Sequence, residues 1–339
     1  MDLTTVWFLF VGAMFIGYAM LDGFDLGVGV LHLLTRTDAE RRITLNSIGP
    51  VWDGNEVWFV VGMGALFGAF PHVYAAMLSG FYVPFVLLLV ALIFRGVAIE
   101  FRSKEHWGWW RSLWDGVFAL GSAVPPVVFG IMIGNVIAGL PIGPSHEFTS
   151  SSFFALFHWY PLLVGLFVLS LFALHGALYL NLKTEGELQV RAKKWARWCF
   201  GVFLVLYLAT TGATLFFYPH MIASFQHHWW AWTLVVLTVL AVANVPRSLH
   251  KGQEYRALVT SSCVIAGTFG LFGIGMFPTL LRSSLNPAWS LDVYNAASSP
   301  GTLKIMLIMA LIGMPFVLAY TLGVYWVFRG KVRKDKLHY

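Results

Sequence analysis

The chain has 339 residues, of which 58% are hydrophobic and 11% are charged, and its formal net charge is +6. Since an average soluble protein has about 25% charged residues, this composition excludes an ordinary soluble domain and predicts a polytopic membrane protein. Fifteen tryptophans and 29 phenylalanines supply the aromatic side chains that face lipid and gather at membrane interfaces.

Nine apolar segments are long enough to cross a bilayer, which takes about 20 residues. They predict an all-α fold with nine transmembrane helices, at residues 6–34, 52–70, 74–99, 114–137, 154–181, 198–218, 228–246, 258–281 and 302–328. The polar connections are too short to form a soluble domain. We expect the helices to form two four-helix bundles and one peripheral helix.

The basic residues lie almost entirely on every second connection and on the C-terminal tail. The positive-inside rule therefore predicts a periplasmic N-terminus and a cytoplasmic C-terminus. Because topology explains the basic charge, nucleic acid is not implied. The 19 residues on this side, of 22 Lys and Arg in all, are Arg36, Arg41, Arg42, Arg102, Lys104, Arg111, Lys183, Arg191, Lys193, Lys194, Arg197, Arg247, Lys251, Arg256, Arg329, Lys331, Arg333, Lys334 and Lys336.

The predicted organisation has three parts that differ in charge. Residues 1–140 form a first bundle with carboxylates in its apolar segments, and residues 141–283 form a second bundle without them. Residues 284–339 supply an outer loop, the ninth helix and the basic tail. The sequences LDG at 21–23 and LHG at 174–176 allow a parallel internal repeat.

Asp22 and Asp25 lie deep inside the first apolar segment. They are three residues apart and share one helix face, and Asp25 is about 16 Å along the helix from Arg36. Charged groups at this depth are costly and mark ion or proton paths by default. A proton relay is the functional interpretation, and a hydrogen-bonded structural pair between helices is the alternative.

Asp53 and Glu56 open the second apolar segment from the cytoplasmic side. Acidic residues near a helix N-terminus are stabilised by the helix macrodipole, which is the structural explanation. They also lie three residues apart, at the level where protons moving toward Asp25 would be taken up. The two interpretations are compatible.

Arg95 lies within the third apolar segment, five residues before Glu100. An unpaired arginine in lipid is costly, so we expect a structural ion pair with a carboxylate of the first or second segment, and direct participation in conduction is the alternative. His175 is the histidine nearest the middle of a segment. A haem held between two helices would need a second axial ligand, and we therefore expect a packing role.

Several motifs together resemble subunit II of cytochrome bd-type quinol oxidases, and the resemblance covers essentially the whole chain. The first two are LDGFDLGVG at 21–29 and GPVWDGNEVW at 49–58, and both are long and unusual. The others are FRGVAIEFR at 94–102, MFP at 276–278, and the outer-loop stretch 286–304. The chain is also short, which resembles the cyanide-insensitive branch.

The resemblance implies a multi-pass protein of the bacterial cytoplasmic (inner) membrane that stabilises a haem-bearing subunit I. That subunit would carry haems b and d and oxidise quinol, and the complex would reduce dioxygen to water. The resemblance further implies no catalytic residue, metal or cofactor bound by this chain alone, and it allows a structural quinone and a small accessory single-helix subunit.

The resemblance also assigns a cytoplasmic proton pathway to this subunit. Asp53 matches the carboxylate usually given that role, with Asp22 or Asp25 nearby, and Glu56 stands where some members have glutamine. A proton- or cation-coupled secondary transporter is the alternative function, because buried carboxylates would serve it equally well, although no matched pair of broken helices is evident.

Overall fold

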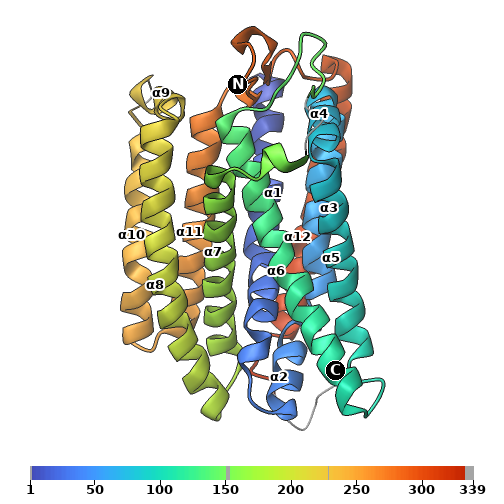
Figure 1. Cartoon of the computed structure of the whole chain (residues 1–339), viewed down its shortest axis with the longest axis vertical. Coiled ribbons are helices and arrows are strands. Elements are labelled where there is room, and N and C mark those ends of the chain that lie inside the picture. Colours follow the sequence, from blue (N-terminus) through green and yellow to red (C-terminus); the bar gives the residue numbers. More distant parts are fainter. Residues whose placement is uncertain (1, 150–152, 228, 333–339) are drawn as a thin grey trace.

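The computed structural model is a bundle of long upright helices (Figure 1), and it describes residues 2–149, 153–227 and 229–332. Within these residues, eight helices are long and apolar enough to cross a membrane, which confirms the all-α membrane class. These are α1 (Leu3–Leu31), α5 (Tyr82–Phe101), α6 (Gly108–Ala138), α7 (Trp159–Lys183), α8 (Gly186–Phe217), α10 (Ala231–His250), α11 (Glu254–Met276) and α12 (Pro300–Val327).

The second predicted helix forms at the expected place, whereas the third is divided into two helices. Helix α3 (Trp52–Ala69) forms where the second segment was expected, but it is not among the eight, because its first turns are polar. Pro71 then starts a separate helix, α4 (Pro71–Gly80), since proline suits a first helical position. The prediction of one helix over residues 74–99 is therefore wrong at its start, because α5 begins only after Phe81.

Two further helix ends were placed wrongly. Helix α8 begins at Gly186, twelve residues before the predicted 198, so the basic run from Arg191 to Arg197 is helical and not a loop. Helix α11 ends at Met276, before the predicted 281, because the residue preceding Pro278 is restricted away from helical geometry. Beyond it, β1 (Thr279–Leu281) pairs antiparallel with β2 (Leu291–Asp292).

The connection after α1 contains an amphipathic helix, α2 (Asp38–Ile48), that the sequence analysis did not predict. Its N-terminus is capped by the Thr37 hydroxyl, which accepts a hydrogen bond from the Glu40 amide at 3.3 Å. The tail residues Arg333, Lys334 and Lys336 lie outside the described residues. The remaining short elements are η1 (His32–Leu34), η2 (Phe153–Leu156), α9 (His220–His227) and η3 (Pro287–Trp289).

Helix α7 lies at the centre of the bundle, in contact with α1, α6, α8 and α11. Its crossing with α1 is close because both helices have glycine there. A Cβ atom on Gly27 would lie 1.9 Å from the Phe172 carbonyl oxygen, and one on Gly176 would lie 2.3 Å from the Gly27 carbonyl carbon. Small residues permit such backbone approach in membranes, and this crossing fixes the part of α1 that carries Asp22 and Asp25.

Candidate functional site

The Arg95 guanidinium lies between two carboxylates from different helices. It binds Asp22 with both arms, through Nη2 to Oδ1 at 2.6 Å and Nη1 to Oδ2 at 3.1 Å. The same Nη2 lies 2.9 Å from Glu56 Oε1, an ionic contact that is not aligned as a hydrogen bond. Arg95 and Asp22 are fully buried, so each charge compensates the other in a region where neither could remain alone.

Asp25 is held by an amide and not by a cation. The Asn55 Nδ2 group donates to Asp25 Oδ2 at 2.7 Å and to the Leu21 carbonyl oxygen at 3.1 Å. The Tyr325 hydroxyl, from α12, donates to Asn55 Oδ1 at 2.9 Å. Asp25 Oδ1 is buried and has no hydrogen-bond partner among the described residues. Asp22 and Asp25, one helical turn apart, therefore differ in their partners: Asp22 is paired with a cation, and Asp25 accepts a hydrogen bond from a neutral amide.

The exposure of the predicted pathway residues decreases toward the interior. Asp53 is exposed, the Glu56 side chain is 24% exposed, and the carboxyl groups of Asp22 and Asp25 are fully buried. Asp53, Glu56 and Glu100 line one groove of about 790 Å³ between α3 and α5. Glu100 makes no ion pair within the described part of the chain, so Arg95 takes its partners from α1 and α3.

A second charged cluster lies near the C-terminal ends of α1 and α5 and the N-terminal ends of α2 and α6. Asp115 of α6 accepts from Arg102 Nε at 2.5 Å and Arg41 Nη1 at 2.7 Å, and it lies 2.6 Å from His32 Nε2. Arg102 also binds Asp38 at 2.8 Å. These bonds fasten α2 beneath the first bundle, and we assign the cluster a structural role because every member is tied to another.

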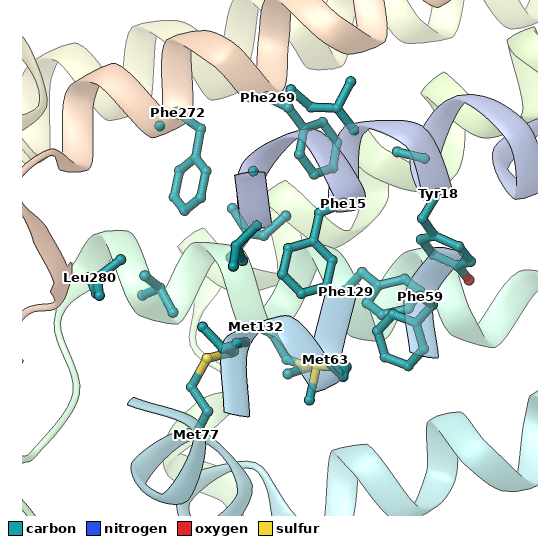
Figure 2. A pocket seen from close by; sticks show the side chains of 18 of the residues that line it. Phe15, Tyr18, Phe59, Met63, Met77, Phe129, Met132, Phe269, Phe272 and Leu280 are labelled. Atoms are coloured by element: carbon teal, nitrogen blue, oxygen red, sulfur yellow. The ribbon is translucent and has the colours of Figure 1, made fainter. Parts of the chain in front are cut away.

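An apolar cavity of about 230 Å³ is lined by the part of α1 that lies N-terminal to Asp22, together with side chains of other helices. Figure 2 shows its side chains, among which the Tyr18 hydroxyl is the polar atom that stands out. That hydroxyl is buried without a hydrogen-bond partner in the described residues. The labelled lining residues are Phe15, Tyr18, Phe59, Met63, Met77, Phe129, Met132, Phe269, Phe272 and Leu280.

His175 lies in a fully bonded position in the centre of α7. Its Nε2 donates to the Met20 carbonyl oxygen at 2.9 Å, because a carbonyl only accepts, and its Nδ1 lies 2.6 Å from the Ser261 hydroxyl. The described residues contain no group of three or more His, Cys, Asp or Glu side chains arranged to hold a metal ion.

The sequence analysis named the charged members of the site but missed its neutral members. Asn55 stands between Asp53 and Glu56 in the GPVWDGNEVW motif, and this position was the one available signal for it. Tyr325 is 270 positions away from Asn55, in a helix whose sequence is largely apolar. Nothing in its local pattern indicates a contact with Asn55.

The fold and site together define a class: a polytopic membrane protein with buried, incompletely paired carboxylates that reach one surface through a groove. Ionisable residues inside a membrane mark candidate functional sites. The profile of the family described as cytochrome bd terminal oxidase subunit II matches residues 3–328. The chain belongs to this family.

Individual relatives agree over nearly their full lengths. The cytochrome bd ubiquinol oxidase subunit 2 of Bacillus subtilis is 37% identical, with 100% of this chain and 99% of the relative aligned. The cytochrome bd-I ubiquinol oxidase subunit 2 of Escherichia coli is 35% identical, with 98% and 96% aligned. The bd oxidase structure from Geobacillus thermodenitrificans shares the fold, with a TM-score of 0.79, 18% identity, and 97% and 98% coverage.

Family membership establishes the activity at the level of the complex. The chain is subunit II of a cytochrome bd quinol oxidase, a quinol:oxygen oxidoreductase of the inner membrane. In this family the haems belong to the partner subunit I. The alternative of a secondary transporter is therefore set aside.

Proposed function

We propose that this subunit takes up protons from the cytoplasm and conducts them toward the oxygen-reducing haem of subunit I, through Asp53, Glu56, Asp22 and Asp25. The observation that carries the proposal is the graded burial of these four carboxyl groups, from the exposed Asp53 to the fully buried Asp22 and Asp25. A conduction path needs such a series, because each group must exchange protons with a neighbour nearer to water.

The four groups have different parts in this path. Asp53 collects protons at the groove mouth, and Glu56, three residues along the same face of α3, receives them. Arg95 holds Glu56 beside Asp22 through one shared Nη2 atom, so it orders the relay without carrying a proton itself. Glu100 stands in the same groove and adds negative charge near its mouth.

The membrane topology is part of the same proposal: nine transmembrane helices, with the N-terminus periplasmic and the C-terminus cytoplasmic. The start of α1 and the end of α12 lie at opposite ends of the bundle (Figure 1), as an odd number of crossings requires. Counting α3 with the eight more apolar helices gives nine. Helices α1, α3, α5 and α6 would form one bundle, α7, α8, α10 and α11 the other, and α12 the peripheral helix.

Subunit I would cover the outward faces of α3 and α5, and this contact would stabilise subunit I. These faces expose large apolar side chains beside a carboxylate-lined groove, which lipid alone would not tolerate. We expect Val60→Trp to reduce recovery of the assembled complex, because the side chain is 67% exposed on α3. Val205→Trp is the matched control, since Val205 is equally exposed on α8 of the other bundle.

The apolar cavity fits a structural quinone. It is larger than the roughly 150 Å³ cavity that admits benzene in an engineered protein, and its walls are apolar. The Phe and Met side chains that line the cavity would hold the ring and tail. A quinone bound there would supply packing, and under this proposal no proton or electron step passes through it.

The proposal is tested by Asp53→Asn in the purified complex. We expect oxygen consumption to fall at least about tenfold, as for loss of a proton-transfer group, while the haem content stays normal. Glu105→Gln removes another exposed cytoplasmic carboxylate and should leave the rate unchanged. Unchanged turnover in Asp53→Asn would remove this residue from the path.

The complex is also proposed to contain a small accessory single-helix subunit. A small additional protein band in the purified complex would identify it.

A further inference from the structure

The orientation of the Asn55 side-chain amide is determined by its neighbours. The Leu21 carbonyl oxygen can only accept a hydrogen bond, so the group 3.1 Å from it must be the Asn55 NH₂. The amide oxygen then faces Tyr325, whose hydroxyl must donate to it at 2.9 Å. Asn55 is 2% exposed, and all three of its polar contacts are therefore fixed in direction.

This orientation makes the two oxygens of Asp25 unequal. Oδ2 accepts the second N–H of Asn55 at 2.7 Å, whereas Oδ1 has no hydrogen-bond partner among the described residues. An N–H group binds the carbonyl oxygen of a carboxylic acid better than its hydroxyl oxygen, since the carbonyl oxygen is the stronger acceptor. A proton on Asp25 therefore resides on Oδ1.

Tyr325 is an unusual residue within α12. Its helix packs loosely, and Leu303 is its one buried residue. Tyr325 nevertheless reaches the bundle interior, where its ring meets the Phe24 ring edge-on, with centroids 6.4 Å apart and planes at 86°. Phe24 in turn stacks on Tyr179 at 4.0 Å. The aromatic contacts thus hold the Tyr325 hydroxyl against Asn55.

We propose that Asn55 and Tyr325 are positioning residues that confine proton exchange at Asp25 to its Oδ1 atom. The ninth membrane helix thereby controls a carboxyl group of the first. This inference rests on the proposed function, in which Asp25 belongs to the proton path. Without the Tyr325 hydroxyl, the Leu21 carbonyl oxygen alone holds the Asn55 NH₂ group in place. The flipped amide, with its oxygen facing Asp25, then becomes more accessible, and the proton can reside on either carboxyl oxygen.

The test compares Tyr325→Phe with Tyr320→Phe in the complete oxidase. Tyr320 lies on the same helix, is 67% exposed, and undergoes the same loss of one hydroxyl. Two properties are measured: the rate of oxygen consumption as a function of pH, and the infrared carboxyl band that disappears in Asp25→Asn. We expect the Tyr325→Phe oxidase to retain its haems. Its turnover should be slower by about fivefold, which corresponds to the free energy of one ordinary hydrogen bond. Both the rate–pH curve and the carboxyl band should shift.

Tyr320→Phe should match the unmodified oxidase in both measurements. If Tyr325→Phe gives the same rate–pH curve and carboxyl band as Tyr320→Phe, while Asp25→Asn is slow, the positioning role is wrong and the proton path stands. If Asp25→Asn turns over at the full rate, the proposed function itself fails at this residue, and the positioning role fails with it.

Discussion

Buried polar side chains differ in their bonding between the first half of the molecule, residues 1–140, and the second half, which follows it. In the first half, Asp25 Oδ1, Tyr18 Oη and Arg95 Nε are buried without hydrogen-bond partners among the described residues. In the second half, both ring nitrogens of the equally buried His175 are bonded. Among the described residues of that half, the unpartnered side-chain atoms are Arg191 Nε and Thr210 Oγ1, and neither belongs to a carboxyl group.

The contrast separates polar groups that hold helices together from polar groups that exchange protons. An unsatisfied buried polar atom costs about 1–3 kcal/mol, so a helix contact is better served by complete bonding, as at His175. A free carboxyl oxygen leaves room for a proton to be gained and lost. Asp25, where the first half leaves one carboxyl oxygen without a partner among the described residues, is a position at which we propose proton exchange.

The largest effect should come from removing Arg95, the fully buried cation of the first half that pairs with Asp22. Arg95→Leu leaves Asp22 without its partner inside the membrane, at a cost of about 3–5 kcal/mol. We expect little assembled, haem-containing complex, measured by its visible spectrum after purification. The double variant Arg95→Leu/Asp22→Leu should recover part of the yield because no lone charge remains. Full assembly of the single variant would show that Asp22 does not need this pair.

A smaller effect should follow from removing the bonded group of the second half. His175→Ala leaves the Met20 carbonyl oxygen and the Ser261 hydroxyl without this partner, and it should lower the unfolding free energy by about 1–3 kcal/mol. We expect a lower midpoint of thermal unfolding with an unchanged rate–pH curve. A shifted rate–pH curve would break the comparison, because it would place proton chemistry in the second half.

The smallest effect is expected at a contact between the two halves, where Arg191 of α8 binds Glu40 of α2. Burial raises the pKa of Glu40, but the Arg36 amide and the Arg191 guanidinium outweigh it and hold this pKa below its usual value. The stabilisation is therefore present above the unfolded-state pKa and is lost as the pH falls through the folded-state pKa.

Glu40→Gln should accordingly lower stability by up to about 1 kcal/mol at neutral pH. The difference from the unmodified protein should vanish at acidic pH, which thermal unfolding at a series of pH values measures. A difference that persists at low pH would mean that Glu40 acts through packing and not through its charge.

Much of the fold could be predicted because lipid imposes strong rules. Apolar length located the membrane helices, and the distribution of Lys and Arg suggested the two sides. The errors arose where local rules compete. Pro71 splits α4 from α3 inside one apolar stretch, and the basic start of α8 is helical although its charges resemble a loop. The amphipathic α2 was missed because its length and polarity are those of a connection.

The candidate site was predictable only in its charged residues. The high cost of charge in lipid singles out Asp22, Asp25 and Arg95 in the sequence, and it requires a partner for Arg95. The partners of Asp25 are neutral and come from distant segments, so no such rule identifies Asn55 or Tyr325. The cavity beside Tyr18 has the same origin, since it forms from side chains of several helices.

Proton uptake during a single turnover tests the central claim most directly. The fully reduced complex is mixed with oxygen in the presence of a pH-indicator dye, and the unmodified oxidase is compared with Asp25→Asn. We predict that oxygen binds the haem at the normal rate in both, whereas proton uptake from the cytoplasmic side slows at least about tenfold in the variant. Uptake at the normal rate in Asp25→Asn, with intact haems, would contradict the proposed path.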